Sequence, residues 1–309
     1  MTNTLPATAN TTGLSIAPND TQAIHDHANE LIDDRHSPAT RKAKALDLKM
    51  FYEWLDLQSG DLIVDAGRIV EFLTYQYTTG KKYATIARYK THLLKHFGLD
   101  LNKPQRETLK DLMRGIAKKV GTKQKQAHAL TVAELKRLLS NCDKTKNGIR
   151  NRAMVSIGFS CALRVSELCA LRVSDIKRLD ASRGEVFIVN SKTDQTGEGY
   201  TIALEQGDHV QPLDDVARHI KKSGLKEGDQ LFNIKPLRFW RIMKELADKA
   251  GIDGVSCHSL RAGFITCAVG AGATIDKVKA ISRHKSTDIL LGYVREADKF
   301  NNNATKKVL

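Results

Sequence analysis

Apolar residues near the start of the chain recur every three or four positions, which is the spacing of an amphipathic helix. The first such stripe consists of Leu48, Phe51, Tyr52 and Leu55. Ser37 is a good N-cap and Pro38 suits the first helical position, so the pattern predicts a helix that begins there. A second helix is predicted over residues 81–95, where isoleucine and leucine side chains supply the apolar face.

The second half of the chain combines helical patterns with one pair of strands. Thr131 and Glu134 have the spacing of a capping box at the start of an amphipathic helix. Residues 184–207 contain two β-rich runs around a polar, glycine-containing turn, which predicts a hairpin. Other helices are predicted over about 149–161, through Leu168 after a turn around Arg164, and from about 214, 236, 259, 275 and 286.

These patterns predict a mainly α (α+β) protein with a small antiparallel β-sheet. Residues 101–127 hold eight basic residues and two acids and end in GTKQKQA, which has no apolar period. We interpret this stretch as a basic linking segment between two domains. The expected order is a flexible acidic leader (1–34), a helical domain (35–120), a basic linker (121–128) and a second domain with a C-terminal tail (129–309).

Charge suggests the kind of partner. The 309 residues carry a formal charge of +14, and the sequence pI is about 9.5. The leader contains five acids and no Lys or Arg, so residues 35–309 carry +19. Such an excess indicates a polyanionic partner, nucleic acid or an anionic membrane. The most apolar stretch, FITCAVGAGA, has ten residues, well short of the roughly 20 that span a bilayer.

Cysteine and histidine patterns exclude other classes of protein. The five cysteines include no C-x-x-C pair and are expected to be reduced, mostly buried thiols of a cytoplasmic protein. His92 and His96 share a helix face, but no third metal ligand lies near them in sequence. We therefore expect no metal site there and interpret the two histidines as solvated or facing DNA.

Residues suited to phosphate chemistry occur in the second domain. In chain order they are Arg164, Lys192, His258, Arg261, His284 and Tyr293. They lie in the segments ALRVSELCALRVSDI, SKTDQTGEG, HSLRAGF and RHKSTDILLGY. Each one alone has a structural explanation: Arg164 could pair with Glu167 on a helix surface, and Tyr293 could pack in the core. Coincidence is a much weaker explanation for all six residues standing in this order.

With these motifs, the second domain resembles the catalytic domain of the tyrosine recombinases, also called phage integrases. The first domain resembles, by pattern, the family's helical core-binding domain. The resemblance implies site-specific recombination through a covalent 3′-phosphotyrosyl intermediate and a Holliday junction, without metal, ATP or another cofactor. It implies that Tyr293 is the nucleophile, Lys192 the general acid, and Arg164 and Arg261 the phosphate ligands. His258 and His284 would donate hydrogen bonds, and His258 would also help to take the tyrosine proton. Glu167 would orient Arg164.

The chemistry explains these residue types. Cleaving a phosphodiester builds negative charge on the non-bridging oxygens, and guanidinium groups bind two such oxygens while remaining protonated. A tyrosine with a pKa near 10 is almost wholly neutral at pH 7, so a base and nearby cations must activate it. The departing 5′-oxygen needs a proton, which the family's lysine supplies.

Two positions depart from the family pattern. Ala162 and Arg283 stand where family members often or usually have glycine. Arg283 could alter the turn that presents His284, because an arginine adopts a positive φ reluctantly.

The resemblance also implies an assembly. The two domains would form a C-shaped clamp around duplex DNA, with four protomers on two sites, and accessory proteins could take part. No further DNA-binding module is expected before residue 37, which favours the simple two-domain, Cre- and Xer-like type from a prokaryotic cell, phage, plasmid or other mobile element. The tail, 295–309, is expected either to fray or to dock on a neighbouring protomer.

Basic side chains of the first domain and linker would face the DNA, with the segment 101–127 crossing it; solvated helix faces are the alternative. The expected DNA-binding residues are Arg41, Lys42, Lys44, Lys81, Lys82, Arg88, Lys90, Lys123 and Lys125. Two rival functions remain: a type IB topoisomerase-like enzyme, and a catalytically silent DNA-binding regulator.

Overall fold

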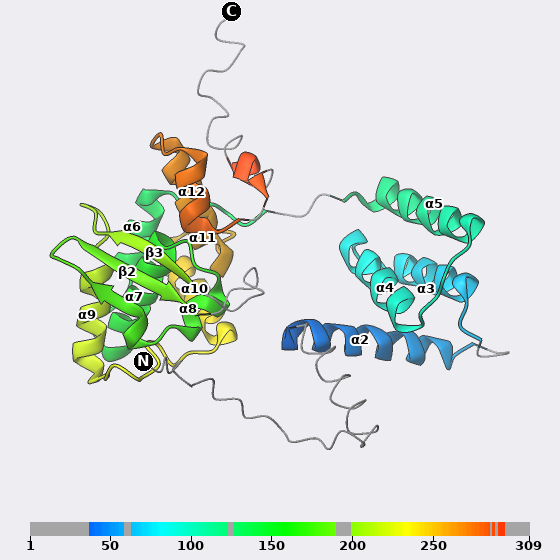
Figure 1. The fold of residues 1–309 in the computed structure, drawn as a ribbon, viewed down its shortest axis with the longest axis horizontal. Helices are drawn as coiled ribbons and strands as arrows, with labels where there is room; N and C mark the ends of the chain where they lie inside the picture. The colour runs from blue at the N-terminus through cyan, green and yellow to red at the C-terminus, as the bar shows by residue number, and fades with distance from the viewer. Residues whose placement is uncertain are drawn as a thin grey trace, which may run out of the picture. The chain divides into compact units, whose positions relative to one another are not determined.

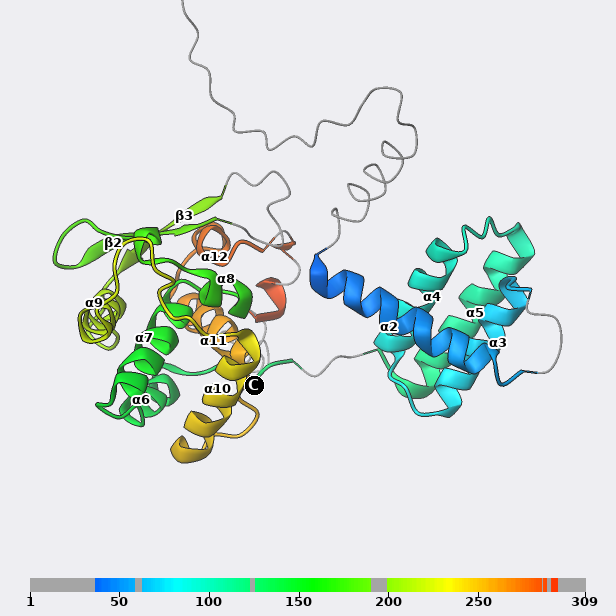
Figure 2. The ribbon, with the colours of Figure 1, turned by 90° about the horizontal axis from the view of Figure 1, so that it is seen from below.

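Two separate hydrophobic cores organise the chain. The computed structural model describes residues 37–58, 63–122, 126–189, 199–284, 286–287 and 290–293. By its internal contacts the chain divides into two units, Met1–Gln124 and Lys125–Leu309, each with its own core (Figures 1 and 2). The predicted fold class, mainly helical with a small antiparallel sheet, is confirmed.

Helices joined by short connections make up the described part of the first unit. They are α2 (Pro38–Leu55), α3 (Ala66–Thr78), α4 (Tyr83–His96) and α5 (Lys103–Val120). The predicted start of α2 is confirmed, since the Ser37 hydroxyl accepts a bond from the backbone N–H of Thr40. Residues 66–78 were not predicted as a helix, although their apolar residues pack in the core.

Most of the basic segment 101–127 is the helix α5, so reading that whole segment as a linker was wrong. Leu109, Met113 and Ile116 lie four and three residues apart and are buried against the other helices. This apolar stripe is narrow and lies between cationic side chains, which hid its helical period. Asn102 and Gln105 form a capping box at its start.

The predicted stripe of α2 is correct except at one position. Phe51 and Leu55 are buried, but Tyr52 is 43% exposed, and Trp54 at 7% takes the inner position. Trp54 follows Phe51 by three residues and therefore lies on the same face of the helix. The Tyr52 hydroxyl lies 3.4 Å from the Nε2 atom of His96 at the surface.

A buried carboxylate ties α2 to α4. Asp47 is fully buried, and its two oxygens accept bonds of 2.8 Å from the Nε and Nη2 atoms of Arg88. The Nδ1 atom of His92 lies 2.7 Å from the same carboxylate. The prediction that His92 is solvated or faces DNA is therefore wrong: a buried charge requires such partners.

The second unit contains the sheet and the remaining helices. Its helices are α6 (Val132–Ser140), α7 (Lys146–Ser160), α8 (Val165–Ala170), α9 (Pro212–Ser223), α10 (Pro236–Ala250), α11 (Cys257–Gly270) and α12 (Ile275–Ser282). The predicted capping box of Thr131 and Glu134 begins α6. Residues 287 and 290–293 are also helical. In the described part of the chain, no helix is long and apolar enough to cross a membrane.

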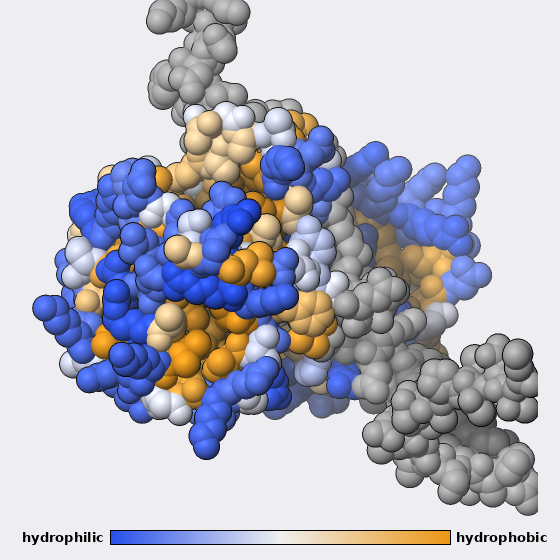
Figure 3. Space-filling model, turned by 60° about the vertical axis from the view of Figure 1, so that its left-hand side comes forward, coloured by the Kyte–Doolittle hydropathy of each residue, from blue (hydrophilic) through white to orange (hydrophobic). Residues whose placement is uncertain are grey.

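The sheet consists of β1 (Ile176–Arg178), β2 (Arg183–Ile188) and β3 (Tyr200–Glu205), antiparallel and in that order. The predicted hairpin is β2 and β3, which pair from Arg183–Glu205 to Ile188–Tyr200. Alternate side chains of both strands turn into the core, so the sheet covers one side of the helices (Figure 2). On the face of the unit shown in Figure 3, hydrophilic side chains surround smaller apolar areas.

All five cysteines are free thiols in this second unit. Cys161, Cys169 and Cys257 are buried, and Cys142 and Cys267 are partly buried. Burial raises the pKa of each thiol, to about 12 for Cys161 and to about 11 for Cys142, Cys169 and Cys257. The predicted mostly buried thiols are confirmed.

Candidate active site

Arg164 is fixed by its own helix. It is the N-cap of α8, and Glu167 in the first turn accepts its backbone N–H at 2.8 Å through Oε2. Oε1 of Glu167 accepts the Nη1 atom of Arg164 at 2.6 Å. The turn before α8 contains Ala162, whose φ of 47° lies in the left-handed region. The Arg164–Glu167 pair that could have been a mere surface contact is therefore present, with its carboxylate buried.

Arg261 contacts both that turn and the ring of His284. It lies in the first turns of α11, is 5% exposed, and donates Nη1 to the Ala162 carbonyl at 2.7 Å. Its Nη2 atom lies 3.3 and 3.4 Å from the two ring nitrogens of His284. Burial and the charge of Arg164 lower the pKa of Arg261 to about 10. Arg261 therefore still carries its charge at neutral pH.

His284 follows the end of α12. Its Nδ1 atom lies 3.0 Å from the Ser282 hydroxyl. Burial, and then the neighbouring guanidinium groups of Arg261 and Arg164, lower the pKa of His284 to about 4. The imidazole is therefore neutral at pH 7 and can both donate and accept a hydrogen bond.

Tyr293 lies beside His284. The two ring centroids are 6.4 Å apart, and the ring planes are inclined by 50°. Tyr293 is half-buried and packs against the small cluster of Ile265, Val278 and Leu290. Core packing, the alternative explanation for this residue, thus holds its ring next to the histidine.

Arg283 adopts the left-handed backbone that its position demands. Its φ is 55° and its ψ 39°, at the C-cap of α12. Both departures from the family pattern, Ala162 and Arg283, thus have positive φ, which in non-glycine residues costs about 1–2 kcal/mol. The Arg283 side chain is 7% exposed, and its Nη2 atom donates to Oε2 of Glu167 at 2.6 Å.

The structure therefore brings Arg164, Arg261, His284 and Tyr293 together, with Glu167 behind them. His258 is exposed in the first turn of α11, one turn before Arg261. Lys192 lies outside the described residues. The contact between Arg283 and Glu167 was not predicted from the sequence, because the two residues lie 116 positions apart.

Basic side chains expected to face DNA occupy several surfaces of the first unit. Arg41 and Lys42 on α2 are exposed, as are Lys81 and Lys82 before α4. Lys44 and Lys90 are half-buried, and Arg88 is held by Asp47 as described above. Lys123 and Lys125 lie outside the described residues.

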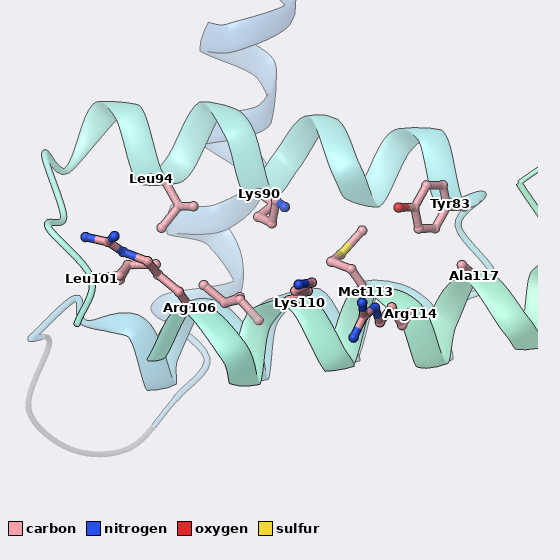
Figure 4. Close-up of a pocket in the computed structure, with 10 residues that line it drawn as sticks. Tyr83, Lys90, Leu94, Leu101, Arg106, Lys110, Met113, Arg114 and Ala117 are labelled. Atoms are coloured by element: carbon pink, nitrogen blue, oxygen red, sulfur yellow. The ribbon is translucent and has the colours of Figure 1, made fainter. Parts of the chain in front are cut away.

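A basic groove lies between α4 and α5 (Figure 4). Its volume is about 410 Å³, and its cationic lining consists of Lys90, Arg106, Lys110 and Arg114. Leu94, Leu109 and Met113 contribute apolar lining. Arg106, Lys110 and Arg114 were not named among the expected DNA-binding residues, although the segment 101–127 that holds them was expected to cross the DNA and their four-residue spacing marks one helix face.

Comparison with known proteins identifies the class. The sequence pattern of the phage integrase family matches residues 128–299. An integrase/recombinase xerD homolog of Selenomonas ruminantium is 25% identical over 293 residues, covering 87% of this chain and 85% of its own length. Tyrosine recombinase XerD of Listeria monocytogenes serotype 4b (strain F2365) is 26% identical over 292 residues, covering 84% of this chain and 89% of its own.

A solved structure shares the fold. The XerH site-specific recombinase bound to a palindromic difH substrate, in a post-cleavage complex, has a TM-score of 0.60 and 17% identity. The match covers 86% of this chain and 78% of that one. The family pattern extends over more than half of the sequence. The chain therefore belongs to the phage integrase family, the family of the tyrosine-type site-specific DNA recombinases.

Proposed function

We propose that this chain cuts and rejoins DNA at specific sites through a covalent 3′-phosphotyrosyl intermediate, with Tyr293 as the nucleophile. One observation carries the proposal: Arg261 contacts both the turn that presents Arg164 and the ring of His284, and Tyr293 lies against that histidine. Two cations, a neutral imidazole and a phenol thus lie close together, and such a set of groups would suit one phosphate.

In the proposed cleavage step, the phenolic oxygen of Tyr293 attacks the scissile phosphorus, and the bond to the 5′-oxygen breaks. Arg164 and Arg261 hold the non-bridging oxygens as their charge grows. His258 accepts the phenolic proton, and Lys192 protonates the departing 5′-oxygen. The phosphodiester linkage is kept in the phosphotyrosyl ester, so a 5′-hydroxyl can reverse the step without ATP.

Neutral His284 would act as a hydrogen-bond donor to the phosphate. Its depressed pKa supports this role, because a neutral ring keeps one N–H donor and adds no further charge beside two guanidinium groups. Glu167 would act by holding Arg164 in place.

The first unit would bind the DNA duplex, and the second would carry the chemistry, in line with the family's core-binding and catalytic domains. The groove between α4 and α5 supports this proposal, since cations with apolar lining suit a phosphate backbone. Four protomers would join two sites through a Holliday junction, with the C-terminal tail of each docking on a neighbour. Such an enzyme would work in the cytoplasm of a prokaryotic cell.

Nicked suicide substrates test the nucleophile. The wild-type protein should form a covalent adduct with the 3′ end of the cut strand. Tyr293→Phe should bind the same DNA within about twofold but form no adduct, because only the hydroxyl is lost. Tyr75→Phe, the same change at an exposed tyrosine of α3, is the matched control and should keep the adduct. An adduct that survives in Tyr293→Phe rules out this nucleophile.

The rival functions give different products. A type IB topoisomerase would relax a plasmid that holds a single site, whereas a recombinase gives junctions from two sites. If the chain were a catalytically silent regulator, the wild-type protein would bind DNA and form no covalent adduct with it. The target sequence needed for these assays can be selected from DNA fragments with the purified chain.

A further inference from the structure

Arg283 is a buried arginine of the candidate site, and the mechanism above gives it no role. Its Nη2 atom lies 2.6 Å from Oε2 of Glu167, and its side chain is 93% removed from solvent. Among the described residues, its Nε and Nη1 atoms have no hydrogen-bond partner. The hydrogen bonding of this guanidinium is therefore directed at one carboxylate.

Glu167 receives donors from two separate parts of the unit. Oε2 accepts both the backbone N–H of Arg164 and the guanidinium of Arg283, while Oε1 accepts the side chain of Arg164. Arg164 lies at the start of α8, and Arg283 at the end of α12. The carboxylate thus links the residue that would hold the phosphate to the residue that directly precedes His284.

We propose that Arg283 is a positioning residue that acts through Glu167 to hold Arg164 in the orientation needed for cleavage. This inference rests on the proposed function and adds to it a residue that stands where the family usually has glycine. It also gives a reason for an arginine in a left-handed backbone conformation: the side chain completes the ion pair behind the site.

The link depends on Glu167 being ionised. Burial works against ionisation, but the charge of Arg283 and the bonds from Arg164 outweigh it and lower the pKa of Glu167. The charges of Arg261 on α11 and of this carboxylate also interact, while Cys161 at the end of α7 and Tyr200 on β3 interact electrostatically with Arg283. Protonated Glu167 would lose one acceptor and its charge, and would hold Arg164 less firmly.

The experiment compares two substitutions at this position. Arg283→Gly removes the side chain but suits the backbone, because glycine adopts a φ of 55° without strain. Arg283→Lys keeps the positive charge and loses the planar fork. Single-turnover cleavage of the nicked substrate is measured from about pH 3.5 to 9, because the lowered pKa of Glu167 places its titration in wild type below its ordinary value of 4.5; DNA affinity is measured beside it.

Arg283→Gly should bind DNA within about threefold of wild type and cleave it at least about tenfold more slowly, because Arg164 is less well held. The acidic limb of its pH–rate profile, where cleavage slows as the pH falls, should move up by about one pH unit or more, since Glu167 loses a neighbouring cation. Arg283→Lys should return the acidic limb most of the way to its wild-type position. In a Glu167→Gln background, Arg283→Gly should move the limb no further.

Asp215 supplies a matched control. Like Glu167 it is a buried carboxylate bonded by two arginines, Arg152 on α7 and Arg218 on its own helix α9. Arg152→Met should lower stability yet leave the pH profile of cleavage in place.

The outcomes separate two failures. A wild-type protein that forms no adduct on its selected DNA overturns the proposed function, and this inference with it. A wild type that cleaves, with an Arg283→Gly variant whose rate and acidic limb are unchanged, overturns only the role of Arg283. A slower variant whose limb does not move would mean that Arg283 merely supports the fold, which also overturns the inference.

Discussion

Replacing His284 by glutamine should remove a large part of the acid sensitivity of the second unit. In the folded protein, burial and the charges of Arg261 and Arg164 lower the pKa of His284 from 6.5 to about 4. In the unfolded chain those neighbours are lost and the pKa returns to its ordinary value. Between the two values the unfolded chain binds more protons, so stability falls as the pH falls.

The magnitude follows from the two pKa values. At about 1.4 kcal/mol per pH unit, the gap between 6.5 and about 4 corresponds to about 3 kcal/mol. This stability is fully present above pH 6.5 and is lost as the pH falls towards 4. Between pH 7 and pH 5 the loss from this group alone should be about 2 kcal/mol. His284→Gln should therefore lose about 2 kcal/mol less than wild type over that interval.

Urea unfolding at pH 7 and pH 5 measures the difference. The chain has two tryptophans, and a Trp54→Phe background leaves Trp240 on α10 to report on the second unit alone. His219, whose pKa burial also lowers, remains in both proteins and cancels in the comparison. His209→Gln, at an exposed histidine of the same unit, is the control. Equal pH dependence in wild type and His284→Gln would refute the depressed pKa.

The same reasoning predicts proton uptake on DNA binding. A bound phosphate would bring negative charge to the guanidinium groups that now oppose protonation of His284, so its pKa should rise. Calorimetry at pH 5 in buffers of different ionisation enthalpy should show protons taken up by wild type on DNA binding, and fewer taken up by His284→Gln.

Three further predictions concern other parts of the chain. Gly263→Ala should destabilise the second unit by about 1–3 kcal/mol in urea unfolding, because the new Cβ atom would lie 2.5 Å from the Leu130 carbonyl oxygen; Gly270→Ala on the same helix meets nothing within 4 Å and is the control. Lys110→Ala in the basic groove should weaken DNA binding at all sequences and make the slope of log K against log salt shallower by about 1; an unchanged slope would place this lysine off the DNA. Lys192→Ala should cleave a 5′-bridging phosphorothiolate far better than normal DNA, because sulfur leaves without a proton; equal impairment on both substrates would argue against a general acid.

The parts of the fold that local sequence determines were predictable. Ser37 and the Thr131–Glu134 pair mark helix starts because caps act within one turn. The hairpin of β2 and β3 follows from two β-rich runs around one turn. By contrast, β1 is three residues long, too short to show any alternation. The choice between Tyr52 and Trp54 also needed the neighbouring helices, since both are large aromatic residues and they flank Phe51 on opposite sides of α2.

The candidate site was predictable in its residue types and not in its contacts. The order of the motifs suggested Arg164, Arg261, His284 and Tyr293, and the close spacing of Arg164 and Glu167 suggested their pair. The bond from Arg283 to Glu167 joins residues 116 positions apart, and only the packed fold decides such a contact. The roles of these residues, and those of His258 and Lys192, stay predictions for the experiments above.

The buried cysteines make the natural chain a convenient starting point for site-directed labelling. Thiol reagents react with the thiolate, and a thiol with a pKa of about 11 is ionised in only about one molecule in ten thousand at pH 7. A cysteine introduced at an exposed position would keep an ordinary pKa near 8.5 and react far faster. Fluorescent or spin labels could therefore be attached at one chosen site in each unit without first removing the five native thiols, and the distance between the two labels could be measured with and without DNA.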